Sequence, residues 1–210
     1  MKIFSHRGLA AGEDENTLLA FKKSVELRLD GVEFDIRYGV DGETVICAHD
    51  KVVGNTAPML AEAFQYLAST NLELLIEFKE YSDDFYAKVV EQIRQYNLVS
   101  RTTIFGFYSE AKQFPWATRQ DIKLGIIAEY PQHLKKYIVL YNPDMVLLGW
   151  GNKKQRLQFK TVWAVLSLAK TFAKYPTVKF VIGVAYTKDD GHWLSKQAGL
   201  YGITADMPLP

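Results

Sequence analysis

The stretches Gly31-Val32-Glu33-Phe34-Asp35-Ile36 and Leu74-Leu75-Ile76-Glu77-Phe78-Lys79 decide how this chain folds. Each is apolar enough to form a buried strand, and each places charged residues two positions apart. Successive strand side chains point to opposite faces, so Glu33 and Asp35 share one face, as do Glu77 and Lys79. A buried carboxylate without compensation costs several kcal/mol, and a divalent cation is the usual compensation.

Two histidines end further apolar stretches. His6 closes the run 2–6, and His49 comes directly after the run 43–48. Carboxylates that share one face, with histidines at the ends of other strands, indicate a metal-dependent enzyme.

Short β-type runs alternate with helical stretches along the whole chain. The expected strands are 2–6, 32–37, 43–48, 73–79, 102–107, 122–127, 145–149, 178–186 and 201–204. The expected helices are 17–29, 58–69, 82–97, 109–118, 131–140, 156–173 and 189–198. In the helix 156–173, the stripe Val162, Val165, Leu166 and Ala169 predicts the buried face. We find no linker, repeat or low-complexity segment, so residues 1–210 are expected to form one catalytic barrel domain.

A hairpin interrupts this alternation. Asp41-Gly42 between the runs 32–37 and 43–48 is a hairpin signal, and folding about it places His49 roughly opposite Phe34. Setting the return strand aside leaves eight strands in βα order, which predicts an α/β fold of the (β/α)8 TIM-barrel type. The final helix is expected to be missing. A doubly wound open sheet is the alternative, but the glycine-rich first turn usual in such folds is absent.

Composition narrows the function classes. Nearly half of the 210 residues are hydrophobic, and the formal net charge is +1, so the whole-chain charge gives no footprint for nucleic acid or an anionic membrane. Cys47 has no intrachain disulfide partner, which fits a reducing compartment. No signal peptide or apolar run of bilayer length is found. We therefore expect a cytoplasmic protein without integral membrane association or a nucleic-acid partner; the oligomeric state stays open.

The charged residues gather where strands end, which is where barrel enzymes place their working groups. His6-Arg7-Gly8, Glu33 with Asp35, His49-Asp50 and Glu77-Phe78-Lys79 could meet at one mouth. Three carboxylates without a cysteine or histidine cluster favour a hard cation, Mg²⁺ or Ca²⁺. Arg7 and Lys79 add positive charge suited to phosphate.

These residues resemble the glycerophosphodiester phosphodiesterase family. The resemblance is carried by His-Arg-Gly (6–8), Glu-Asn-Thr (15–17), Val-Glu-Phe-Asp (32–35), Asp-Gly…His-Asp (41–50) and Ile-Glu-Phe-Lys (76–79). The closing Thr204-Ala205-Asp206-Met207-Pro208 is similar to the family's Thr-Asp-x-Pro, with alanine in place of threonine. The order and spacing of the first four motifs are jointly specific, although each alone is weak.

The resemblance implies a barrel that hydrolyses small-molecule glycerophosphodiesters to sn-glycerol 3-phosphate and an alcohol. It implies Glu33, Asp35 and Glu77 as metal ligands, His6 and His49 as the acid/base pair, and Arg7 with Lys79 as phosphate ligands. By the same analogy, the substrate's 2-hydroxyl, aligned by the metal, attacks phosphorus. One histidine accepts its proton, the other protonates the departing alcohol, and water then opens a cyclic phosphate. The sequence assigns neither histidine to either role.

One departure concerns the substrate. Family members usually carry an insertion of several dozen residues after the His-Asp motif, whereas His49 and Glu77 are 28 positions apart here. A shortened lid leaves room for a bulkier lipid, as in a lysophospholipase D-like phosphodiesterase. A catalytically weak metal- or ligand-binding barrel is the alternative of another class, but retention of both histidines argues against it.

Ordinary structural roles compete with several of these assignments. The carboxylates could form an internal ion-pair network with Arg37 and Lys79. Asn16 and Thr17 are more typical of helix capping than of ligands, Cys47 is interpreted as core, and His133 and His192 as surface residues. Phe107, Trp150 and Tyr186 follow strands and could line the mouth, although aromatic packing would explain them equally well.

Overall fold

The computed structural model describes residues 1–9, 14–52, 54, 56–119, 121–150 and 153–208. Its barrel strands are β1 (Lys2–His6), β2 (Gly31–Tyr38), β4 (Glu73–Phe78), β5 (Thr102–Phe107), β6 (Lys123–Ile127), β7 (Met145–Gly149), β8 (Lys179–Ala185) and β9 (Gly202–Ala205). The principal helices are α1 (Leu18–Glu26), α2 (Leu60–Ala68), α3 (Asp83–Gln95), α4 (Tyr108–Ala111), α5 (Leu134–Tyr141), α6 (Lys153–Val165), α7 (Leu168–Ala173) and α8 (Lys188–Ser195). Short 3-10 turns at Val99–Arg101 and Pro131–His133 precede β5 and α5.

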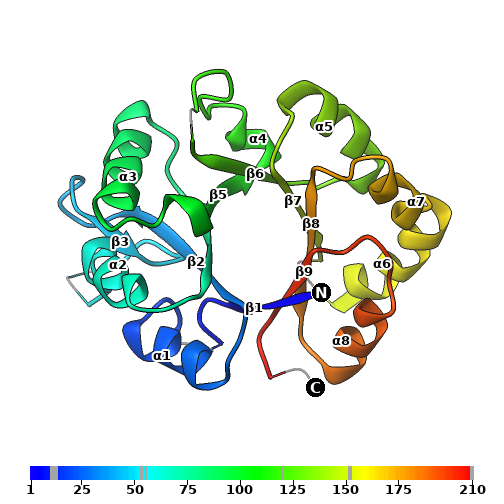
Figure 1. Cartoon of the computed structure of the whole chain (residues 1–210), viewed down its shortest axis with the longest axis horizontal. Coiled ribbons are helices and arrows are strands. Elements are labelled where there is room, and N and C mark those ends of the chain that lie inside the picture. The colour runs from blue at the N-terminus through cyan, green and yellow to red at the C-terminus, as the bar shows by residue number, and fades with distance from the viewer. Residues whose placement is uncertain (10–13, 53, 55, 120, 151–152, 209–210) are drawn as a thin grey trace.

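The eight strands close into a parallel barrel with the helices around it (Figure 1). Neighbours follow the order β1-β9-β8-β7-β6-β5-β4-β2, and β1 also pairs with β2, which closes the ring. This closure confirms the (β/α)8 prediction and excludes the open doubly wound sheet. Residues 206–208, which follow β9, form no helix.

The predicted hairpin is present as the short strand β3 (Val45–Cys47), which pairs antiparallel with β2 outside the ring. Ile36 lies opposite Cys47, and the Ala48 amide donates to the Asp35 carbonyl at 3.0 Å. Continued by two residues, this register places His49 opposite Phe34, as the position of Asp41-Gly42 predicted. The ladder itself ends at Cys47, so His49 stands just beyond it.

Alternation along the strands builds two separate cores. The larger core fills the space between sheet and helices and contains Val32, Phe34 and Ile36 of β2. A smaller core, Phe4, Leu75, Phe105, Met145, Leu147 and Val181, fills the barrel interior. Since Glu33 and Asp35 alternate with the outward-facing residues of β2, they point into the barrel, above the small core.

Two helix predictions are wrong in their extent. The expected helix 109–118 is only α4, with four residues. The expected helix 156–173 is split into α6 and α7 at Ser167, whose φ of 49° is left-handed and cannot continue a right-handed helix. The predicted buried stripe is correct only in part: Leu166 and Ala169 pack half-buried against the core, but Val165 is 74% exposed, and the fully buried residues are Phe159, Trp163 and Leu168. No helix among the described residues is both long and apolar enough to cross a bilayer.

Candidate active site

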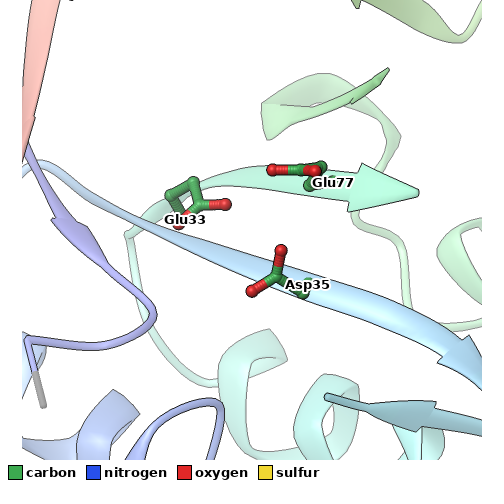
Figure 2. Close-up of side chains that lie close together, drawn as sticks. All are labelled: Glu33, Asp35 and Glu77. Atoms are coloured by element: carbon green, nitrogen blue, oxygen red, sulfur yellow. The ribbon is translucent and has the colours of Figure 1, made fainter. Parts of the chain in front are cut away.

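Three carboxylates from two neighbouring strands converge inside the barrel (Figure 2). Asp35 of β2 is in register with Glu77 of β4, and Glu33 lies two residues earlier on β2. Each of the three offers one oxygen, and these oxygens lie within 4.8 Å of one another. All three residues are buried, so their mutual repulsion is poorly screened by solvent.

The closeness of the three carboxylates shifts their pKa values. Burial, followed by the charge of Asp35, raises the pKa of Glu33 to about 8 and also raises the pKa of Glu77. Burial would raise the pKa of Asp35 as well, but the positive charges of Lys79 and Arg7 outweigh it and lower that pKa. The protein's own cations therefore compensate Asp35 well and leave Glu33 short of positive charge.

The two predicted phosphate-binding residues lie among these carboxylates. The Lys79 ammonium is 2.9 Å from Asp35 Oδ1 and also contacts Glu77 Oε1. Arg7 Nη1 donates to Glu15 at 2.6 Å, and Arg7 Nε is 3.2 Å from Asp35 Oδ2, close enough for an ion pair although not aligned for a hydrogen bond. Both cations are thus already partnered in this structure, while still lining the pocket.

Arg37 does not join this network. Its Nη1 donates to the His49 carbonyl at 2.9 Å, and its Nη2 lies 3.4 Å from Glu80 Oε1. The structural alternative of an ion-pair network with Arg37 and Lys79 is therefore correct for Lys79 and wrong for Arg37.

His6 reaches the same place from β1, where it is in register with Glu33. Its Nδ1 is 2.6 Å from Asp206 Oδ1, and its Nε2 is 3.9 Å from Glu33 Oε2. An ionised carboxylate can only accept, so Nδ1 carries the hydrogen and Nε2 is left facing the pocket. Burial lowers the pKa of His6, but Asp206 and Glu33 outweigh it and the pKa is raised.

The turn after β1 fixes that histidine. Arg7, Gly8 and Leu9 have φ values of 50°, 85° and 63°, and the Arg7 amide donates to Glu33 Oε2 at 3.1 Å. A Cβ at Gly8 would lie 2.5 Å from the Ala20 Cβ, so only glycine lets α1 pack this close to the turn.

His49 enters from the hairpin and is more accessible than His6. Its side chain is 37% exposed, and its Nδ1 lies 3.0 Å from Asp50 Oδ1. The pocket of about 610 Å³ is lined by both histidines together with Arg7, Glu33, Glu77 and Lys79. Phe107, Trp150 and Tyr186 line it too, which places all three predicted mouth residues at this cavity. Asp35 lies beneath this lining, 1% exposed.

The three aromatic residues differ in their surroundings. Phe107 and Tyr186 are 42% and 43% exposed, whereas Trp150 is 6% exposed, packs against Phe159 and has no hydrogen-bond partner for its indole N–H. Trp150 therefore lines the pocket and also packs against another aromatic ring. Phe107 and Tyr186 present open ring surface to the mouth.

Two residues that support the site were not identified as such from the sequence. Asn16 is 2% exposed; its Nδ2 donates to Asp35 Oδ2 at 3.1 Å, and its Oδ1 accepts from the Asp35 amide at 2.9 Å. Only Thr17 of the Asn-Thr pair caps α1, accepting from the Ala20 amide at 3.2 Å. Asp206 supports His6 through the contact with Nδ1. The closing motif marked Asp206 in the sequence, but the motif does not indicate which residue Asp206 contacts.

The remaining predictions concern residues away from this centre. Cys47 is 1% exposed, and burial raises the pKa of its thiol, as expected for a core residue. His133 and His192 are exposed on the outside of the barrel.

The donor set fits a hard divalent cation. Oxygen ligands at about 2.0–2.6 Å from Mg²⁺ or Ca²⁺ lie at most about 5 Å apart, and the carboxylate oxygens here meet that limit. Burial and the nearby charge of Asp35 raise the pKa of Glu33 to about 8, so a bound cation would stabilise its ionised carboxylate. Glu33, Asp35 and Glu77 are thus suited to hold such an ion.

Comparison with known proteins gives a consistent picture. The model of the glycerophosphoryl diester phosphodiesterase family matches residues 6–206. A glycerophosphodiester phosphodiesterase of Caldanaerobacter subterraneus subsp. tengcongensis is 24% identical over 160 residues, which cover 60% of this chain and 65% of that protein, less than two thirds of its length.

Two solved structures share the fold. A glycerophosphodiester phosphodiesterase from Thermotoga maritima aligns with a TM-score of 0.76 at 18% identity, covering 98% of this chain and 94% of its own. A phosphodiesterase from Oleispira antarctica, in complex with the product sn-glycerol-3-phosphate, aligns with a TM-score of 0.72 at 16% identity, covering 99% and 94%.

Proposed function

This chain belongs to the glycerophosphoryl diester phosphodiesterase family, and from that premise we propose that it hydrolyses glycerophosphodiesters to sn-glycerol 3-phosphate and an alcohol. The observation that carries the proposal is the convergence of His6, His49 and the carboxylates on one pocket at the carboxyl ends of the barrel strands. The Oleispira antarctica structure, which holds sn-glycerol-3-phosphate, supports the choice of product.

The chain's own residues have distinct parts in this proposal. Glu33, Asp35 and Glu77 would hold a divalent cation, Mg²⁺ or Ca²⁺, which when bound supplies positive charge to the phosphate oxygens and the attacking hydroxyl. His6 presents Nε2 to the pocket because Asp206 occupies Nδ1, and His49 enters the same pocket from the hairpin. A phosphodiester bound there therefore meets two groups able to accept or donate a proton.

Arg7 and Lys79 are proposed to bind phosphate by exchanging partners. Both line the pocket while paired with carboxylates, so a cation held by those carboxylates would compete for the same oxygens. Their positive charge would then be available to the substrate's phosphate. Their present contacts support a role in keeping the carboxylates in place until a metal ion binds.

The test is hydrolysis of glycerophosphocholine by the purified protein, followed as release of sn-glycerol 3-phosphate. Activity is expected with Mg²⁺ or Ca²⁺, and none with the double variant Glu33→Gln, Asp35→Asn. Glu73→Gln is the matched control, because Glu73 lies on β4 at the opposite end of the barrel, bound by Lys2 and Tyr201. No hydrolysis across a panel of glycerophosphodiesters and divalent ions would refute the proposal.

A second candidate, a lysophospholipase D-like reaction on a bulkier lipid, is favoured by the open rim. Phe107, Tyr186 and Tyr130 line the pocket and are 42%, 43% and 55% exposed. None of the described residues between 50 and 59 lines it. An acyl chain on the glycerol would meet ring surface at this rim.

We also propose that the enzyme works in the cytoplasm. The support is Cys47, the single cysteine, which is buried and unpaired and needs no oxidising compartment.

A further inference from the structure

The near-zero net charge of the chain conceals a strong separation of charge. Residues 130–179 contain nine of the 25 lysines and arginines but one of the 24 aspartates and glutamates. This basic sector (residues 130–179, spanning α5, α6 and α7) thus carries a net charge of +8, and the rest of the chain −7. Figure 1 shows α5, α7 and α6 together on one side of the ring, between α4 and α8.

We propose that the outer surface of the basic sector is a docking surface for an anionic lipid bilayer, which the protein binds peripherally. The first observation is that most of its basic side chains are exposed at the surface, although Arg156 is paired with Asp190 of α8. Lys135 and Lys136 on α5, Lys154 and Lys160 on α6, and Lys170 and Lys174 around α7 are all exposed. The single acidic residue, Asp144, is neutralised by Arg119 at 2.9 Å.

The second observation is that aliphatic side chains stand exposed between these lysines. On α5, Val139 is 77% and Leu140 57% exposed; on α6, Leu157 is 75% and Val165 74% exposed. Both helices already have a buried side, which includes Ile138 on α5 and Trp163 on α6. The exposed aliphatic residues are therefore surplus to the core, and basic helices with such residues are typical of binding at the membrane interface.

The third observation is that the basic sector borders the pocket. Tyr130, just before α5, and Gln155, in the first turn of α6, line the pocket. A protein bound through this sector would hold its mouth beside the bilayer. That placement would suit a lipid-derived substrate, and this advantage rests on the proposed function. Binding to the bilayer does not itself depend on catalysis.

Other occupants fit less well. A second copy meeting the same face would bring together two surfaces rich in exposed lysine, which repel each other. A single-stranded nucleic acid would favour several exposed rings for base stacking. Tyr137 of α5 and Phe159 and Trp163 of α6 are instead turned into the core, and the exposed ring of Tyr130 lies at the pocket. Lipid headgroups with acyl chains beneath them match both the lysines and the aliphatic residues.

The experiment is co-sedimentation of the full chain with vesicles of phosphatidylglycerol and phosphatidylcholine in equal parts, and with pure phosphatidylcholine. Binding is expected to the anionic vesicles, to weaken as salt is raised. Lys135→Glu with Lys136→Glu should lower the partition coefficient at least about 25-fold, since each lysine contributes about fivefold. The matched control, Lys22→Glu with Lys23→Glu on exposed positions of α1, should change it little.

A second variant, Leu157→Ser with Val165→Ser, tests the aliphatic contribution and should lower binding about tenfold without altering charge. Both variants change exposed residues, so unchanged thermal unfolding and unchanged hydrolysis of soluble glycerophosphocholine are expected. The proposal is overturned by equal binding to both vesicle types, by an equal loss in the α1 control, or by tight binding of duplex DNA where vesicles are not bound. None of these outcomes depends on whether the enzyme is active.

Discussion

Asn16 provides the sharpest test of how the carboxylate cluster is held. Its amide and carbonyl both bond Asp35, at 3.1 and 2.9 Å, and its backbone has a left-handed φ of 58°. Asn16→Ala removes both hydrogen bonds and leaves the buried Asp35 amide without its partner. The lost bonds cost about 1–3 kcal/mol each, and alanine tolerates the left-handed backbone less well than asparagine by about 1 kcal/mol. We expect the free energy of unfolding to fall by about 3–7 kcal/mol.

The assay is urea unfolding at neutral pH in EDTA, with the m-value checked for constancy. Asn16→Gly separates the two contributions, because glycine accepts the positive φ and loses only the side-chain bonds. Asn16→Asp keeps an acceptor for the Asp35 amide but sets a carboxylate oxygen where the donating nitrogen was. That variant should be at least as destabilised as Asn16→Ala.

Thr17→Ala is the control from the neighbouring position. It removes the α1 cap bond to Ala20 and should cost about 1 kcal/mol, without touching Asp35. The reasoning fails if Asn16→Ala costs no more than Thr17→Ala, or if Asn16→Asp is as stable as the wild type.

Four further predictions concern activity. EDTA should abolish hydrolysis and Mg²⁺ or Ca²⁺ should restore it; full activity in the chelator would exclude the metal assignment of Glu33 and Asp35. His6→Ala and His49→Ala should each lower kcat by at least about 10²-fold with little change in Tm, and near wild-type kcat in either would remove that residue from the mechanism. Asp206→Asn should lower kcat by about 10–10²-fold at unchanged KM, because it positions His6 without contacting substrate; an effect on KM alone would contradict this. Lysophosphatidylcholine should be turned over with kcat/KM within about 10³-fold of glycerophosphocholine, and a larger gap, some 4 kcal/mol, would mean that the pocket is closed by other means.

The sequence by itself determined the features that follow from local spacing. The i, i+2 placement of Glu33 and Asp35 fixes a shared face, and Asp41-Gly42 fixes a hairpin whose observed register agrees with the predicted one. The eight barrel strands, seven of them followed by a helix, are each a local pattern too, so the closed barrel could be predicted by counting them. Strand periodicity and turn chemistry act over a few residues, so both can be identified from a single sequence.

Helix ends were less predictable. The chain divides at Ser167, where the backbone is left-handed, and α4 has four residues, whereas apolar spacing alone suggested longer helices. The charge of the basic sector was present in the sequence, but its meaning depends on α5, α6 and α7 lying together on one side of the ring.

Only the tertiary structure decided which distant residues support the site. Asn16 reaches Asp35 across 19 positions, and Asp206 reaches His6 across 200, because β9 closes the ring beside β1. The pairing of β4 with β2 sets Lys79 against Asp35 and so directs its charge to the carboxylates. Such contacts leave no periodic trace in the chain, since they arise when strands far apart in sequence become neighbours and bury their polar groups together.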